Sequence, residues 1–511
     1  MTANLFAAFE TSFVAAAARP ALHLADRRII TYGDLDLHAG HLAQNLQAQG
    51  IVPGDRVAVQ VEKSAENVVL YLACLKAGAV YLPLNTAYTD SELDFFFADA
   101  EPGMIVCAPE RAEAIQKLGS SAGVAIHTLD AAGGGSLFEQ NPAIDERFAA
   151  ASEQFVTVPR EKDDLAAILY TSGTTGRSKG AMITHGNLRA NAETLIEAWG
   201  ISSSDVLLHA LPIYHVHGLF VALNTCFMTG AEIIFQQKFE TDAVLDALPE
   251  ATVMMGVPTF YTRLLASERL TPDRCKTMRL FVAGSAPLLD ETFRAFEKRT
   301  GHAILERYGM TETGMLCSNP LNGERRPGTV GPPLADVQVR VADEQGTVLA
   351  PGETGVLEVR GPNVFKGYWR MPEKTKEEFR EDGFFITGDI SRIDEHGYVN
   401  IVGRAKDMII SGGFNVYPKE IEAVIDQLPG VGESAVIGLR HPDLGEGVAA
   451  VVTEDGDGQA IDDAAIIAAV RKNLAGYKVP KAVFIVEALP RNAMGKVQKN
   501  QLREQFASVF L

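Results

Sequence analysis

Hydrophobic residues in the first 160 positions recur in two alternating patterns, one with helical spacing and one with strand spacing. Helical spacing covers residues 35–48 and 65–77, and the second stretch stops at Gly78. Short apolar stretches typical of strands occupy residues 56–61, 81–84 and 104–107. This alternation predicts an α/β layered fold with largely parallel sheets. Residues 130–153, which include three consecutive glycines, are expected to form a loose surface connection.

The same rhythm resumes after residue 160 and changes character twice. Strand-like stretches are expected at residues 165–170, 181–184, 207–211, 231–235, 253–257, 278–282 and 303–305. Helices are expected from about Asn187 and over residues 259–267. From about residue 325, alternating stretches separated by Asp, Glu and Gly predict a smaller β-rich subdomain. A new α+β pattern begins after Lys406, which predicts an N-terminal domain over 1–405 and a small C-terminal domain over 406–511.

Composition narrows the class of protein without changing the predicted fold. The 511 residues are 47% hydrophobic and 22% charged, which is ordinary for a globular enzyme. A formal net charge of −19 argues against nucleic acid or an anionic membrane as a partner. Five singly spaced cysteines disfavour a zinc site and a disulfide framework, and together with the lack of a signal-peptide pattern they favour the cytoplasm. The most apolar stretch, residues 218–235, carries Asn224 and Glu232, so a buried helix and strand are expected there.

The segment 169–180, with the sequence LYTSGTTGRSKG, places hydroxyl side chains, glycines and cations between two apolar strands. Backbone amides freed by glycine, hydroxyl donors and a lysine together form a nest for phosphate oxygens. The segment is not a Walker A loop, because Ser178 occupies the second glycine position and Gly180 follows Lys179. A flexible linker is the alternative, and it is disfavoured because linkers do not lie between two buried strands.

Three other segments carry unusual polar density. Residues 306–313 offer Glu312 as a Mg²⁺ ligand and Tyr308 as a flat face for a base. Asp389 follows a glycine at the expected end of a strand, where acids commonly hold ribose hydroxyls. Lys496 lies in a loop rich in proline and glycine. Taken singly, each of these residues also fits an ordinary turn or a solvated surface position.

Taken together, and with residues 403–407, these motifs resemble the adenylate-forming superfamily of acyl-CoA synthetases, peptide-synthetase adenylation domains and luciferases. The resemblance spans nearly the whole chain and follows the family's order and spacing, with one departure, since Ser178 stands where the family usually has proline. It implies a two-step reaction. A carboxylate attacks the α-phosphate of Mg·ATP to give acyl-AMP and pyrophosphate, and the thiol of coenzyme A then displaces AMP.

The resemblance also implies residue roles. Catalysis is assigned to Lys496, which bridges the carboxylate and the α-phosphate, to Glu312 and Thr171 as the Mg²⁺ ligands, and to His215 at the mouth of the acyl pocket. The implied ATP contacts are Thr171, Ser172, Gly173, Thr174, Thr175, Gly176, Lys179, Gly284, Ser285, Ala286, Glu306, Arg307, Tyr308, Gly309, Met310, Thr311, Asp389, Arg404 and Lys496. The C-terminal domain is expected to rotate about Lys406. The implied coenzyme A contacts are Ser411, Gly412, Gly413 and Phe414. Lys496 also resembles lysines that protein acetylases modify in this family, which makes a lysine acetylase a candidate partner.

The acid that is activated is the least constrained feature. The segments 212–220 and 259–265 look like the malonyl-CoA synthetase branch, which implies malonate or methylmalonate as the small-molecule carboxylate substrate. Its expected contacts are His215, Arg263, Ser285 and Met310. Arg263 is expected to bind a second carboxylate of the acid, and the alternative is that it is an ordinary surface arginine. Arg279 is a second candidate for this contact, but a structural role is favoured for it. His217 is expected to be structural, with a role in proton transfer left open.

Three other functions stay open: a synthetase for another short or aromatic acid, an adenylation enzyme that loads a carrier protein, and a non-catalytic homologue. The intact Lys496 and Glu312 argue against the last of these.

Overall fold

The computed structural model describes residues 2–139, 155–171, 178–411, 414–442, 444–456, 462–474, 476–492 and 495–510, with the backbone alone at 139, 406, 414 and 415. The expected surface connection over 130–153 therefore lies outside the described residues from position 140 onward. Among the described residues, no helix combines the length and the apolar character needed to cross a bilayer.

The first layer is a six-stranded sheet in the order β6-β5-β3-β4-β7-β8, parallel except between β7 and β8. Its strands are β3 (Arg56–Gln60), β4 (Val80–Pro83), β5 (Met104–Cys107), β6 (Ala125–Thr128), β7 (Leu165–Thr171) and β8 (Lys179–Thr184). Its helices are α2 (Tyr32–Ala48), α3 (Ala65–Ala77), α4 (Asp90–Ala100), α5 (Ala112–Gln116) and α6 (Ser136–Glu139). Helix α3 ends as expected, because Gly78 adopts the left-handed conformation (φ 71°) that closes a helix.

The second layer is an eight-stranded sheet in the order β14-β13-β12-β11-β9-β10-β1-β2, parallel at its centre. Its strands are β1 (Pro20–Leu24), β2 (Ile29–Thr31), β9 (Val206–His209), β10 (Glu232–Phe235), β11 (Val253–Gly256), β12 (Leu280–Ala283), β13 (Leu305–Met310) and β14 (Gly314–Ser318). Its helices are α1 (Leu5–Ala15), α7 (His185–Trp199), the π-helix η4 (His217–Leu223), α8 (Asn224–Thr229), α9 (Thr241–Ala247), α10 (Pro258–Leu265) and α11 (Asp290–Thr300). These two layers share one continuous apolar core.

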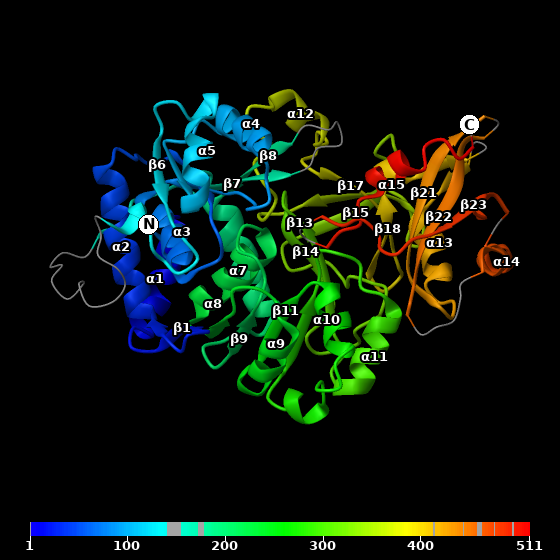
Figure 1. Cartoon of the computed structure of the whole chain (residues 1–511), viewed down its shortest axis with the longest axis horizontal. Helices are drawn as coiled ribbons and strands as arrows, with labels where there is room; N and C mark the ends of the chain where they lie inside the picture. Colours follow the sequence, from blue (N-terminus) through cyan, green and yellow to red (C-terminus); the bar gives the residue numbers. More distant parts are fainter. Residues whose placement is uncertain are drawn as a thin grey trace.

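A smaller antiparallel sheet, β15-β16-β17-β18, forms the expected β-rich subdomain. Its elements are β15 (Gln338–Ala342), β16 (Gly355–Arg360), α12 (Pro372–Glu377), β17 (Phe385–Ile393) and β18 (Val399–Arg404). The C-terminal α+β unit follows, with β19 (Ile409–Ser411), β20 (Phe414–Val416), α13 (Pro418–Ile425), β21 (Val431–His441), β22 (Gly445–Glu454), α14 (Asp463–Asn473), β23 (Ala482–Ile485) and α15 (Lys499–Gln505). It has apolar clusters of its own, and it lies beside the β17–β18 edge (Figure 1).

The structure corrects two sequence expectations. The motif 306–313 was expected to follow a strand, but most of it forms β13, which turns into β14 as a hairpin. Glycine permits this turn, since a Cβ at Gly309 would lie 2.1 Å from the carbonyl oxygen of Gly314. Asp389 was expected at the end of a strand, but it lies inside β17. Gly388 (φ 71°) accompanies a shift of pairing register within the strand, which is a β-bulge instead of a strand end.

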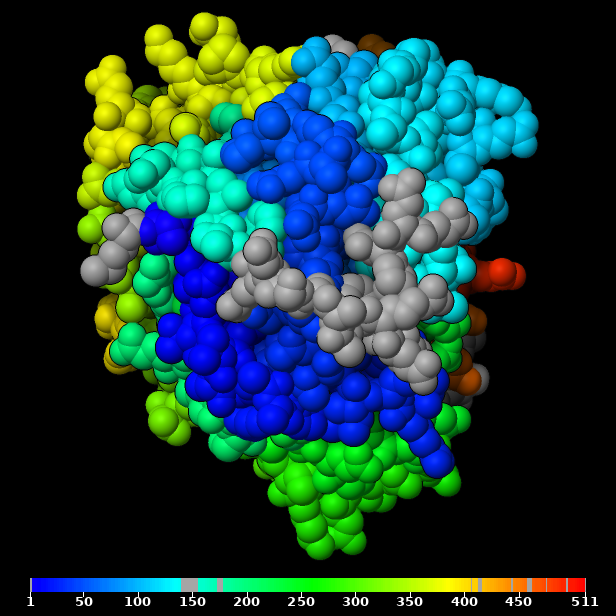
Figure 2. Space-filling view, turned by 90° about the vertical axis from the view of Figure 1, so that its left-hand side faces the viewer, coloured from blue at the N-terminus to red at the C-terminus, as the bar shows by residue number. Residues whose placement is uncertain are grey.

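Viewed from the side opposite the C-terminal unit, the surface consists mainly of the N-terminal helices and strands, with C-terminal residues only at the rim (Figure 2). Lys406 lies in a short 3-10 turn, Ala405–Asp407, between the β18 and β19 sheets. The boundary between residues 405 and 406 stays a prediction.

Candidate active site

The two residues expected to hold a metal lie together at the junction of the first two layers. Thr171 ends β7, and its hydroxyl donates to Glu312 Oε1 over 3.3 Å from the β13–β14 turn. Burial raises the pKa of Glu312 above its ordinary value. The described residues contain no group of three or more His, Cys, Asp or Glu side chains able to hold a metal ion. One buried carboxylate beside a hydroxyl fits Mg²⁺ when substrate phosphates supply the remaining oxygen ligands.

Lys179, at the start of β8, is joined to this carboxylate through two residues that sequence reasoning missed. Its Nζ lies 2.9 Å from Glu378 Oε1 and 3.9 Å from the centre of the Tyr368 ring. The Tyr368 hydroxyl lies 2.7 Å from Glu378 Oε2 and 3.2 Å from Glu312 Oε1. Nothing in the sequence marks Tyr368 or Glu378, because a tyrosine and a glutamate ten positions apart are commonplace.

The middle residues of the segment expected to bind phosphates lie outside the described residues; they are Ser172, Gly173, Thr174, Thr175 and Gly176.

Tyr308, Asp389 and Arg404 form a second polar group on facing strands. Asp389 and Arg404 are direct partners on β17 and β18, and Arg404 Nε lies 2.6 Å from Asp389 Oδ1. The Tyr308 hydroxyl donates to Asp389 Oδ2. Burial opposes the charged form of Arg404, but Asp389 and Tyr308 beside it raise its pKa above the ordinary value. The structure therefore brings the expected ribose and base contacts together.

The turn after β12, Gly284 to Ala286, lies against the first residues of β13. Ser285 adopts a φ of 71°, which is uncommon for a residue with a side chain, and its Oγ lies 3.2 Å from His217 Nδ1. Glu306 Oε1 accepts a hydrogen bond from the Leu288 amide over 3.2 Å, and burial raises the pKa of Glu306 to about 8. Met310 ends β13, and Thr311 follows it directly before Glu312.

Two histidines of the segment before and within η4 are neutral at physiological pH. Burial, followed by the nearby cations Lys496 and Arg307, lowers the pKa of His215 to about 3. Burial also lowers the pKa of His217 well below its ordinary value. The segment is anchored from behind, since Lys63 Nζ lies 2.7 Å from His209 Nδ1 and His209 Nε2 lies 2.9 Å from the Gly218 carbonyl oxygen.

Lys496 reaches this site from the C-terminal unit. The preceding residue, Gly495, lies against the start of α10, where a Cβ on it would be 3.7 Å from Thr259 Oγ1. Burial and Arg404 lower the pKa of Lys496, while Asp389 and Glu312 oppose that effect. The lysine is therefore within electrostatic reach of both acidic centres of the site, although more than 100 residues separate it from either in sequence.

The two arginines considered as clamps differ sharply. Arg279 is fully engaged, with Nε and Nη2 each 2.7 Å from an oxygen of Asp205 and further bonds to the carbonyl oxygens of Trp199 and Gly200. Its role is structural, as the sequence analysis favoured. Arg263 is exposed and makes no hydrogen bond or ion pair within the described part of the chain. It lies four residues after Thr259 on α10, so the two side chains share one helix face.

The expected coenzyme A contacts are only partly described. Ser411 is buried at the end of β19, and the backbone of Phe414 begins β20. Gly412 and Gly413 lie outside the described residues, as do the side chains of Phe414 and Lys406.

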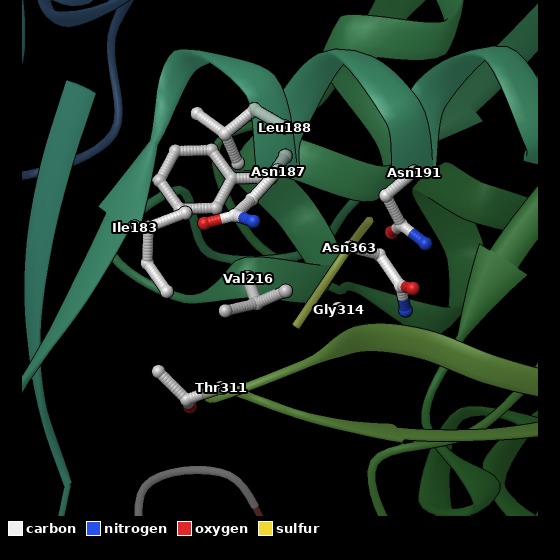
Figure 3. A pocket seen from close by; sticks show the side chains of 9 residues that line it. Ile183, Asn187, Leu188, Asn191, Val216, Thr311, Gly314 and Asn363 are labelled. Carbon is white, nitrogen blue, oxygen red and sulfur yellow. The ribbon is translucent and has the colours of Figure 1, made fainter. Parts of the chain in front are cut away.

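A small cavity lies behind the histidine segment. Side chains of α7 face Val216 and the tip of the β13–β14 hairpin, which carries Thr311 (Figure 3). Its volume, about 20 Å³ for the centres of water molecules, suffices for one ordered water and falls far below that of a ligand pocket. We therefore assign no substrate to it.

Comparison with known proteins agrees with this geometry. The ATP-bound structure of MatB from Rhodopseudomonas palustris is 55% identical, with both chains fully covered and a TM-score of 0.95; the TM-score against the apo form is 0.84. Feruloyl-CoA synthase of Amycolatopsis sp. is 37% identical over 93% of this chain and 94% of that protein. A malonate–CoA ligase of Arabidopsis thaliana is 34% identical over 91% of this chain and 80% of that protein.

Family models cover most of the chain. The AMP-binding enzyme model matches residues 9–369, and the model of the AMP-binding enzyme C-terminal domain matches residues 420–496. The chain therefore belongs to the AMP-binding enzyme family.

Proposed function

We propose that the chain is an AMP-forming acid–thiol ligase that converts malonate and coenzyme A into malonyl-CoA through a malonyl-adenylate, with methylmalonate as the nearest alternative acid. One observation carries this proposal. Lys496 lies within electrostatic reach of Glu312, Asp389 and His215, so a single cation acts on the place where an acid, a ribose and a phosphate would meet. The similarity to ATP-bound MatB and to a malonate–CoA ligase supports the choice of reaction and of acid.

In the first step, negative charge grows where the acid carboxylate attacks the α-phosphate. Lys496 supplies positive charge at that point, and the pair of Asp389 and Arg404 orients the ribose. Glu312 and Thr171 would hold Mg²⁺, which supplies positive charge to the phosphate oxygens when bound. Lys179 holds the outer phosphates. His215 is neutral at physiological pH, so it shapes the pocket mouth without adding a charge.

The second step needs Lys496 to leave and the thiol of coenzyme A to enter. We propose that the C-terminal unit turns about Lys406 and brings residues 411–414 to the acyl-adenylate. Glycine at positions 412 and 413 would let the pantetheine arm pass close to the backbone.

Arg263 is our proposed contact for the second carboxylate. Arg263 lies on the same face of α10 as Thr259, which is close to the loop that carries Lys496. The Arg263 guanidinium has no partner among the described residues. A carboxylate matches the two-pronged geometry of arginine.

A substrate panel tests the proposal. Malonate, methylmalonate, propionate, butyrate and ferulate are compared by pyrophosphate release and by thioester formation, with and without coenzyme A. We expect malonate to be preferred and thioester to form only with coenzyme A. A preference for ferulate would contradict the proposal and indicate an activity like that of feruloyl-CoA synthase. Acyl transfer to a carrier protein in place of coenzyme A would indicate an enzyme that loads a carrier protein.

The clamp has its own test. Arg263→Ala should lower kcat/KM for malonate by about 30-fold or more and leave propionate nearly unchanged, because truncating a charge-paired contact costs about 2–5 kcal/mol. Arg294→Ala, which removes another exposed arginine from α11, is the matched control. Equal losses for malonate and propionate would show that Arg263 is not the clamp.

We also propose that Lys496 is the position at which a lysine acetylase would switch the enzyme off. The residue keeps solvent-accessible surface at the edge of the site, and acetylation removes the charge that the first step needs. Mass spectrometry of the protein before and after treatment with a deacetylase, paired with adenylation rates, tests this.

A further inference from the structure

Lys63 is a buried cation outside the residues assigned to the reaction. It follows β3 in the first layer, is 6% exposed, and has three acceptors within hydrogen-bond distance of Nζ in the described part of the chain. They are His209 Nδ1 at 2.7 Å, the His209 carbonyl oxygen at 3.0 Å and the Gln236 carbonyl oxygen at 2.6 Å. Nζ also lies 4.3 Å from the centre of the Phe235 ring. All of these groups lie at the carboxyl ends of β9 and β10, which belong to the second layer.

The contacts define the protonation of both side chains. Burial lowers the pKa of Lys63, but an ammonium has three N–H donors for the three acceptors, whereas a neutral amine has two. His209 Nε2 lies 2.9 Å from the Gly218 carbonyl oxygen, which can only accept, so Nε2 has to carry the ring proton. Burial and the charge of Lys63 lower the pKa of His209 well below its ordinary value, so the ring keeps a single proton. His209 therefore accepts from Lys63 on one side and donates to Gly218 on the other.

Gly218 connects this contact with the mouth of the proposed acyl pocket. The residues on either side of it bond to His215, since the His217 amide lies 3.4 Å from His215 Nδ1 and the Leu219 amide donates to the His215 carbonyl oxygen. The turn is tight, because a Cβ on Gly218 would lie 2.0 Å from the Pro212 carbonyl oxygen. A displacement of Gly218 therefore displaces His215 as well.

We infer that Lys63 is a positioning residue for acid binding, which acts through His209 and Gly218 to hold His215 at the mouth of the acyl pocket. The inference rests on the proposed function, which places His215 at that mouth, and deepens it. Lys63 comes from the first layer and its acceptors from the second. The cation therefore also fixes the histidine segment relative to the sheet that carries residues 169–171 and 178–180.

The binding of the acid should depend on Lys63 more than the binding of ATP does. Asp389 and Arg404 pair with each other, and Lys179 pairs with Glu378. These expected ATP contacts are therefore held by partners of their own. His215 depends instead on the segment that Lys63 anchors.

Substitution of Lys63 tests the inference. Lys63→Met removes the donors, keeps most of the volume, and should raise the KM for malonate about tenfold in a pyrophosphate-release assay, while the KM for ATP changes less than about twofold. Lys63→Gln retains a donor and should recover part of the loss. Lys76→Met is the matched control, since Lys76 is 2% exposed, with Nζ 2.6 Å from Asp36 Oδ1 and 4.5 Å from the centre of the Phe6 ring. It should lower the unfolding midpoint but leave both KM values unchanged.

The outcomes distinguish the positioning role from the proposed function. A wild-type protein that prefers another acid would refute the choice of malonate, and the same comparison made with that acid would still test Lys63. Equal changes of both KM values in Lys63→Met, or a rise for the acid no larger than in Lys76→Met, would overturn the positioning role. If Lys63→Met does not fold, Lys63→Gln and His209→Phe are compared with Lys76→Gln. An unchanged KM for the acid in both overturns the role.

A spectroscopic readout needs no substrate. Nuclear magnetic resonance of protein with isotope-labelled histidine reports the ring nitrogens of His209 and His215. Lys63→Gln should shift the signals of both rings, and Lys76→Gln should shift neither. Unaltered His215 signals in Lys63→Gln would show that the contact does not reach the pocket mouth.

Discussion

The contact between Lys179 and Glu378 predicts an exchange between a protein carboxylate and a bound phosphate. Their side chains are 8% and 19% exposed, and the charged atoms lie 2.9 Å apart. Exposed pairs contribute about 0–1 kcal/mol, whereas breaking a buried pair costs about 3–5 kcal/mol. The intermediate burial suggests a cost of about 2 kcal/mol for Glu378→Gln, which would lower the unfolding midpoint of a chain this long by roughly 2 °C.

Added MgATP should return most of that loss, because its phosphates offer Lys179 the negative charge that Glu378 no longer supplies. The assay is thermal unfolding of the wild-type protein and the variant with and without MgATP. Glu377→Gln is the matched control, since this neighbour is 66% exposed and, among the described residues, its ion pair is with Lys374 alone. If Glu378→Gln and Glu377→Gln lower the unfolding midpoint equally, the contact between Lys179 and Glu378 does not stabilise the protein. If MgATP stabilises Glu378→Gln no more than wild type, the exchange of partners is wrong.

Two further predictions follow from the site. Lys496→Ala should slow formation of the acyl-adenylate by about 100-fold or more but spare thioester formation from supplied acyl-AMP. The two half-reactions are measured separately, and an equal loss of both would refute the role of Lys496 in the first step. His215→Asn should make the protein less sensitive to acid. His215 has a pKa of about 3 in the folded protein and near 6.5 in the unfolded chain, so protonation of the unfolded chain lowers wild-type stability as the pH falls below 6.5. At pH 5, this histidine alone should lower the free energy of unfolding by about 2 kcal/mol. Denaturant unfolding at pH 5 and 7.5 checks the difference, and identical pH dependence in the two proteins would contradict it.

Much of the fold was readable from local patterns. Helix α3 and strand β5 begin and end at the predicted residues, because a continuous apolar stretch closed by a turn residue specifies both an element and its end. The placement of the 169–180 segment between two strands was confirmed as well. Gly388 and Gly309 show where local patterns fail: a glycine signals a turn, but whether it makes a bulge, a hairpin or a strand end depends on the strand that pairs with it.

The candidate site divides in the same way. Its motifs were visible in the sequence because phosphates, ribose and Mg²⁺ require particular polar groups in short, dense segments. The partners of those motifs were not visible. Tyr368 and Glu378 gain their meaning from contacts with Glu312 and Lys179, which lie 56 and 199 positions away.

By itself, the sequence determined the layered α/β fold, the family resemblance and the residues able to carry adenylation chemistry, since these depend on side-chain type and local spacing. Only the tertiary structure decided that Arg279 is engaged by Asp205, whereas Arg263 is exposed on α10. The physical reason is that burial and charge pairing are sums over neighbours from distant parts of the chain. Two arginines that look alike in sequence therefore differ in whether their charge is available to a substrate.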